Sequence, residues 1–397
     1  MTIHPSGSFF LKPAQHIVSL ALNSIVFDYV KDDSYRIVVG MLNRILHRDS
    51  KEELKATTIK DRVVSCGYAI SEAYSHEAEN MLSSHHVQFG DDGKIDKEHL
   101  SDAIKAPTLP TTITWEDAED IINSYNEAKE SKREKIKDVT KVVAIETSPK
   151  DVCYISIDDV SVKYQKNDRV NNLSSTRKYV ENTVIHIQTP KFQYCITAIG
   201  MEKAFRILFA FLLKNNIFEN HRFVFFTDGA NNIFSHIDKY FSFREHYVIL
   251  DWFHLRKRIK ELLSMALKGK IEKKREYIRD ILRILFAGNV EDAKAYLSSF
   301  DEKKIKNIDK LNEAINYLDR KAPFIACYAL RARLHLRISS NRVEKANDMI
   351  VANRQKHNGM SWSEKGSGAL AAITAAKQNG VLYTWICSKQ VSLEIAA

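Results

Sequence analysis

Cysteine is scarce in this 397-residue chain, and the few that occur are scattered. They are odd in number and form no C-x-x-C pair, which argues against a disulfide framework and a cysteine-based zinc site. A reduced intracellular protein is therefore expected. The five cysteines are Cys66, Cys153, Cys195, Cys327 and Cys387.

Long apolar runs are also missing. The longest candidate, residues 207–213, is far too short to cross a bilayer, and no charged-then-apolar leader opens the chain. There is no internal repeat or low-complexity segment. We expect a soluble, cytoplasmic protein without a membrane partner, long enough for two or three domains.

The charge balance is basic, with 59 Lys and Arg against 50 Asp and Glu and a net charge of +9. Such a balance favours a polyanionic partner without proving one.

Residues 1–90 are predicted to be helical. Within them a helix over 57–66, a turn at Gly67 and a helix over 70–82 match a helix-turn-helix DNA-binding domain, and equally a plain helical hairpin. In the first case Lys60 and Arg62 would contact DNA. Residues 91–150 are expected to form a linker, turn-rich at first and then a charged, solvated helix over 115–141.

Strand-like segments begin at residue 152 and alternate with helices further on. This order predicts an α/β (α+β) fold, a mixed five-stranded sheet with flanking helices, which is the element order of ribonuclease H-like domains. The catalytic domain would comprise 151–268 and 339–397, with an all-helical insertion over 269–338. The predicted strands are 152–158, 183–188, 194–199, 222–227 and 246–250, with a hairpin turn at 189–191 and helices at 201–214 and 233–241. The predicted helices after the last strand are 255–266, 271–286, 293–300, 305–318 and 322–336.

Two aspartates fall at strand ends in this scheme. Asp158 follows the first strand and Asp228 the fourth, and these strands are neighbours in the expected sheet. Two such carboxylates with a distant glutamate can hold two divalent cations for phosphodiester chemistry. Asp228-Gly229 is also typical of a plain turn. Asp159 points to the opposite face from Asp158 and is the fallback.

Glu344 is the favoured third acid, at the start of a helix. Its alternative role is the third position of a capping box with Asn341 as the cap. Glu364 and Asp251 are the competing candidates for the third acid.

Several basic residues are candidate DNA contacts, although each could equally lie on a solvated helix face. His254 opens a basic helix, without a cysteine partner that would indicate zinc. The remaining candidates are Arg256, Lys257, Arg258, Arg354 and Lys356.

Taken in order, these motifs resemble bacterial insertion-sequence DDE transposases related to the Mutator group. The motifs are Asp158 with Val162-Lys163, Asp228-Gly229, the His254 helix start, Ser-Ser-Asn-x-x-Glu-x-x-Asn over 339–347, and the segment 354–362. The resemblance covers roughly residues 150–370. One departure is that Asp251-Trp-Phe-His254 stands where many Mutator-like members carry Cys-x-x-His.

The resemblance implies Asp158, Asp228 and Glu344 as an acidic triad that binds two Mg²⁺ or Mn²⁺ ions. It further implies cleavage at terminal inverted repeats, strand transfer into target DNA, and a homo-oligomer that is nucleoid-associated when bound to DNA. Two alternatives are a ribonuclease H-like nuclease or resolvase without strand transfer, and an inactive DNA-binding derivative.

Overall fold

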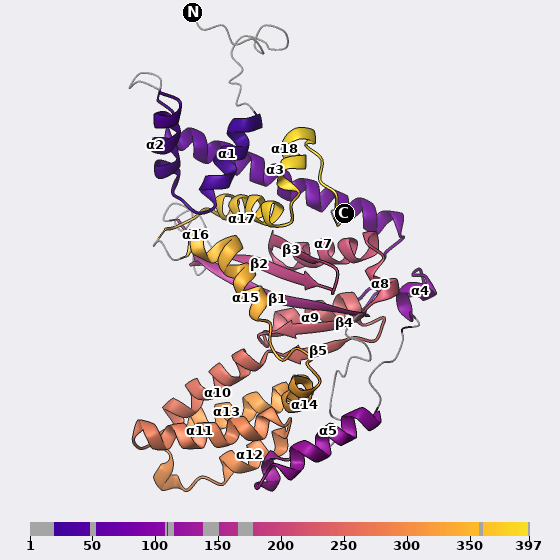
Figure 1. The fold of residues 1–397 in the computed structure, drawn as a ribbon, viewed down its shortest axis with the longest axis vertical. Helices are drawn as coiled ribbons and strands as arrows, with labels where there is room; N and C mark the ends of the chain where they lie inside the picture. The colour runs from indigo at the N-terminus through magenta and orange to yellow at the C-terminus, as the bar shows by residue number, and fades with distance from the viewer. Residues whose placement is uncertain are drawn as a thin grey trace, which may run out of the picture.

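The computed structural model describes residues 20–47, 53–107, 109, 115–137, 151–165, 178–356 and 360–395. It contains a mixed five-stranded sheet with helices on both faces (Figure 1). The α/β class and all five predicted strands are confirmed. The strands are β1 (Val152–Lys163), β2 (Tyr179–Gln188), β3 (Gln193–Ile199), β4 (Arg222–Thr227) and β5 (Tyr247–Leu250).

The strand order is β3-β2-β1-β4-β5. Strand β2 pairs antiparallel with β1 and, through the predicted hairpin, with β3, whereas β4 pairs parallel with β1 and with β5. Strand β1 continues to Lys163, well beyond its predicted end at Asp158. Asp158 therefore lies inside β1, at the point where its partner β4 stops.

Side chains of β1 alternate between the two faces of the sheet. Ile155 and Ile157 pack with helices α7 (Met201–Lys214) and α9 (Asn231–Phe241). On the other face, Val160 and Val162 join one hydrophobic cluster and Val152 and Tyr154 join another. Asp158 lies between these two clusters.

The second of these clusters contains the all-helical insertion, at the lower end of Figure 1. The predicted helix over 322–336 is wrong, because Pro323 lies in a 3₁₀ turn and only residues Tyr328–Arg333 are α-helical. The insertion helices are α10 (Trp252–Ala266), α11 (Ile271–Phe286), α12 (Val290–Ser298), α13 (Ile308–Lys321) and α14 (Tyr328–Arg333).

The charged stretch before the sheet packs on this insertion. Helix α5 (Trp115–Glu127) buries Ala118, Ile122 and Tyr125 against residues after α11 and in α14. The helix ends at Glu127, short of its predicted end, while most of the charge run over 129–135 is exposed. Residues 1–19, 138–150 and 357–359 of the predicted segments lie outside the described residues.

The N-terminal helices lie at the opposite end, with the C-terminal helices α17 (Glu364–Gln378) and α18 (Leu382–Ser388) (Figure 1). They are α1 (Leu20–Val30), α2 (Tyr35–Ile45) and α3 (Ala56–Ser84). The turn predicted at Gly67 is wrong, because α3 runs unbroken through it. Gly67 serves close helix packing instead, since a Cβ there would lie 2.0 Å from the carbonyl oxygen of Ala369 in α17.

A last helical segment crosses the sheet face that carries Asp158. It consists of α15 (Asn341–Asn347), a π-helical turn (Asp348–Ala352) and α16 (Asn353–Gln355). Two short helices, α4 (Asp102–Lys105) and α8 (Ile217–Asn220), complete the fold. Within the described ranges, no helix has both the length and the apolarity needed to span a bilayer.

The Gly67 contact gives a stability prediction. Gly67→Ala should lower the free energy of unfolding by about 1–3 kcal/mol, because the added methyl group meets backbone that cannot move aside easily. Gly40→Ala in α2 is the matched control, since nothing lies within 4 Å of its Cβ position. It should be neutral or stabilising by up to about 1 kcal/mol. Equal stability of the two variants in denaturant unfolding would contradict the packing role of Gly67.

Candidate active site

Asp158 and Asp228 lie side by side on one face of the sheet. The parallel register pairs Ile157 with Thr227, the last residue of β4, so Asp158 in β1 and Asp228 just after β4 both follow that pair. Adjacent strands are about 4.8 Å apart. Tyr154 and Phe226, which point to the same face as the aspartates, pack in one cluster with the insertion helices. The strand pairing thus brings together two carboxylates far apart in sequence.

Asp158 is half-buried and strongly perturbed. Burial, and then the neighbouring Asp228 carboxylate, raise its pKa to about 6, while His254 opposes the shift. Two donors hold its carboxylate: the backbone N–H of Asp159 at 2.8 Å and Nδ2 of Asn347 at 2.6 Å. A carboxylate that is costly to ionise beside a second one is a feature of sites that bind cations or protons.

The fallback Asp159 lies on the opposite face. Its carboxylate accepts hydrogen bonds from Oγ1 of Thr183 at 2.6 Å and from Nδ2 of Asn232, on α9, at 3.3 Å. These contacts fasten β1 to β2 and α9. The structure therefore separates Asp159 from Asp228.

Asp228 stabilises a tight turn and also belongs to the candidate site. Its Oδ1 accepts from the backbone N–H of Ala230 at 2.8 Å, and Gly229 has a φ of 93°, which favours glycine. Gly229 also lies against the side chains of Tyr317 and Lys321 from α13. The turn and the site are compatible, and the insertion reaches the Asp228 side of the site.

Lys321 was missed from the sequence. It is buried, and its Nζ donates to Oδ1 of Asn231 at 2.9 Å. Burial and Arg320 lower its pKa, and the Asp228 carboxylate opposes that effect. The only pattern in the sequence around Lys321 is apolar residues at helical spacing. The sequence therefore gave no sign that this lysine would be buried near Asp228.

Glu344 lies on α15 and pairs with His254. Its Oε1 is 3.4 Å from Nε2 of His254. The alternative capping box is wrong, because α15 begins at Asn341 and its N-cap is Ser340. The Ser340 hydroxyl donates to Asp251 at 2.7 Å and makes no cap bond. Glu344 is thus turned toward the site by its histidine partner.

Asp251 is a structural clamp. Its Oδ1 accepts from the backbone N–H groups of Phe253 at 2.6 Å and His254 at 3.0 Å, and caps α10. Its Oδ2 accepts from the backbone N–H and the hydroxyl of Ser340. With 1% exposure and both oxygens engaged, Asp251 fastens the start of α10 to the start of α15. This contradicts its role as a third acid.

Glu364 lies outside the site. It accepts a hydrogen bond from the Tyr164 hydroxyl at 2.7 Å, beyond the end of β1. Tyr164 is six positions along the chain from Asp158, which is about 20 Å at the rise of an extended chain. Glu364 therefore cannot share an ion with the two aspartates.

Asn347 is a second residue missed from the sequence. It is buried, it donates to Asp158, and its own Oδ1 finds no hydrogen-bond partner among the described residues. The available signal was its spacing from Glu344, because residues three apart share a helix face. A buried amide oxygen beside a carboxylate is an unsatisfied hard ligand.

The side chains present fit a divalent cation at the aspartate pair. Among the described residues, no three His, Cys, Asp or Glu side chains lie close enough to hold one ion. The acids form a pair on the sheet and a separate Glu344–His254 ion pair beside it. Two aspartates and the Asn347 oxygen provide the hard oxygen donors that Mg²⁺ and Mn²⁺ prefer.

The predicted basic contacts divide into exposed and engaged residues. Arg354 is wrong as a DNA contact, because it is buried and its Nε donates to the backbone oxygens of Val30 and Asp33. Arg258 and Arg62 are partly buried and bonded, to Glu313 and Asn23 respectively. The exposed members are Lys60, Arg256, Lys257 and Lys356.

Comparison with protein-family models, curated proteins and solved structures finds no match to this chain. The likeness to insertion-sequence transposases therefore stays a prediction from the motifs and their order.

The raised pKa of Asp158 predicts how the stability of the folded protein depends on pH. The folded state retains the Asp158 proton up to about pH 6, so the free energy of unfolding should fall as pH rises from about 4 to about 6. Asp158→Asn removes that decline and should be more stable above pH 6 by about 1–2 kcal/mol. The measurement is denaturant unfolding across pH without divalent cations.

The matched control is Asp159→Asn, one residue along on the other face. This substitution disturbs the contacts of Asp159 with Thr183 and Asn232. It should be neutral or destabilising at every pH. A less stable Asp158→Asn protein at pH 7.5 would refute the interpretation of Asp158 as a strained site residue.

The hydrogen bond from Asn347 to Asp158 gives a second prediction, which is tested by metal binding rather than by enzyme activity. Asn347→Ala removes a donor to the ionised form of Asp158, so the pKa of Asp158 should rise further. The pH at which Mn²⁺ binding is half-maximal, measured by calorimetry, should move upward. Asn353→Ala, exposed on α16, is the control and should leave that pH unchanged. An unchanged midpoint in Asn347→Ala would rule out this role.

Proposed function

We propose that this protein is a DDE transposase of an insertion sequence, with a ribonuclease H-like catalytic domain. Its substrates would be the terminal inverted repeats of the element and a target DNA, and its cofactors two Mg²⁺ or Mn²⁺ ions. The observation that carries the proposal is the pair Asp158 and Asp228, side by side in the strand order β3-β2-β1-β4-β5.

Three further features support the proposal. Glu344 approaches the same face on α15, as the third acid of such a triad would. The all-helical insertion lies between β5 and α15, which is its place in the predicted family pattern. The net charge of +9 suits a polyanionic substrate.

Each side chain of the candidate site would have its own role in the reaction. Asp158 and Asp228 would hold a shared cation, and the Asp158 proton would have to leave first. Asn347 orients the Asp158 carboxylate through its Nδ2 donor. Glu344 would join them on release from His254. When bound, the cations activate the attacking oxygen and stabilise the leaving oxygen of an in-line displacement.

The test is DNA cleavage and strand transfer on duplexes that carry the DNA flanking the reading frame, with Mg²⁺ or Mn²⁺. Asp228→Asn and Glu344→Gln should each lower both reactions about a thousandfold or more, because residues that act as one catalytic unit fail together. Glu364→Gln is the matched control for Glu344→Gln and should keep wild-type activity. Full activity in either triad variant would sink the assignment.

The product pattern separates the two alternatives. Nicked DNA without joined product would favour a nuclease or resolvase of the same fold. Salt-sensitive binding to a DNA end with no metal-dependent cleavage would favour an inactive DNA-binding derivative.

A further inference from the structure

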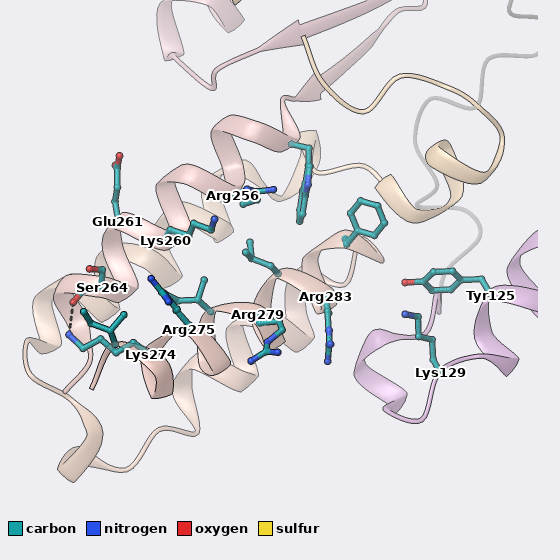
Figure 2. Close-up of a pocket in the computed structure, with 15 residues that line it drawn as sticks. Tyr125, Lys129, Arg256, Lys260, Glu261, Ser264, Lys274, Arg275, Arg279 and Arg283 are labelled. Atoms are coloured by element: carbon teal, nitrogen blue, oxygen red, sulfur yellow. Dashed lines mark hydrogen bonds between the residues drawn. The ribbon is translucent and has the colours of Figure 1, made fainter. Parts of the chain in front are cut away.

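A large groove lies in the helical insertion, outside the candidate active site. It has a volume of about 1000 Å³ and runs between α10 and α11, with Tyr125 and Lys129 at one end (Figure 2). We refer to it as the α10–α11 groove. Arg256 and Lys260 line it from α10, and the arginines 275, 279 and 283 line it from α11.

The side chains of α11 are arranged in two rows along the groove. Arg275, Arg279 and Arg283 recur every four residues, and so share one helix face at intervals of about 6 Å. Ile278 and Leu282 form an apolar row beside them. Figure 2 shows Arg256 and Lys260 on α10, and Arg279 and Arg283 extending from α11 on the side away from α10, where they still line the groove. The groove therefore has a cationic edge and an apolar wall.

The charge in the groove is only partly balanced by the protein, since Arg283 has Glu134 at 3.9 Å. Within the described part of the chain, Arg256, Lys260, Arg275 and Arg279 are exposed and make no side-chain hydrogen bond or ion pair. Glu261 is the one acid among the lining residues. Like charges gathered in a concave surface repel one another, so folding alone does not account for them. An anionic ligand would neutralise them.

The groove starts next to the candidate active site. His254, which pairs with Glu344, is on the first turn of α10, and Arg256 follows two residues later. From Arg256 to Ser264 at the far end, α10 extends about 12 Å. Residues two apart lie on opposite sides of a helix, so a polymer bound at the acidic site would reach the groove by passing around the start of α10.

We propose that the α10–α11 groove holds one strand of the DNA substrate next to the site of cleavage. The phosphates follow the α11 arginines, and the bases lie against the apolar wall. A positive groove that also carries aromatic side chains, here Tyr125, Trp252 and Phe286, is the arrangement used for single strands. The volume is that of a large ligand pocket and suits a few nucleotides better than a duplex. This inference rests on the proposed function, which supplies the DNA substrate.

The test is binding of a labelled single-stranded oligonucleotide to the full chain, measured by fluorescence anisotropy over a range of salt concentrations. The triple variant Arg275→Gln, Arg279→Gln and Arg283→Gln should bind at least about tenfold more weakly. The slope of log affinity against log salt should shrink by about 2, at roughly 0.7 per phosphate contact on a single strand.

The control removes the same charge elsewhere. Lys273, Lys303 and Lys306 are exposed and do not line the groove. The triple variant with glutamine at these positions should keep the wild-type slope to within about 1. The replaced arginines are exposed on α11, and thermal unfolding of each variant confirms an intact fold.

Affinity and slope that fall equally in the two triple variants would overturn the groove assignment and leave the proposed function standing. The groove assignment also fails if the arginine variant loses duplex binding but retains single-strand binding. If the wild-type chain neither binds nor cleaves any DNA, the proposed function itself fails. Selective loss of single-strand binding in the arginine variant supports the inference.

Discussion

The parallel pairing of β1 with β4 is the constraint on which the candidate site depends. Because successive strand residues face opposite sides, a slip of one residue would move Asp228 away from the face that carries Asp158. The register is fixed by apolar side chains on both faces, such as Phe225 on one and Phe226 on the other. The hydrophobic core therefore brings two like charges together, and the raised pKa of Asp158 records the cost.

The Asp251 clamp explains how the site tolerates a long helical insertion. Asp251 bonds to Ser340 across the whole insertion, and the backbone of Trp252 donates to the carbonyl of Ile338 beside it. Both ends of the insertion are thus held at one place, just after β5. Lengthening a loop whose ends are fixed adds little free energy, so the helices between can grow without moving Glu344.

Local patterns predicted the elements well, because strand alternation and helix periodicity are written in neighbouring residues. The helix Ile271–Phe286 and the strand Arg222–Thr227 match their predicted bounds. The errors arose where a distant contact decides the outcome. Gly67 looks like a turn but serves a helix crossing, Arg354 looks like a surface cation but binds buried carbonyls, and Asn347 gains its meaning only beside Asp158. The identity of a residue does not reveal such partners.

Helix α10 contributes side chains both to the candidate active site and to the α10–α11 groove. One side carries His254, which holds Glu344, and the other carries Arg256 and Lys260 in the groove. A shift or rotation of α10 would therefore be felt at both places. Thermodynamic linkage makes such an effect reciprocal: a ligand that favours one position of the helix changes the other site by the same factor.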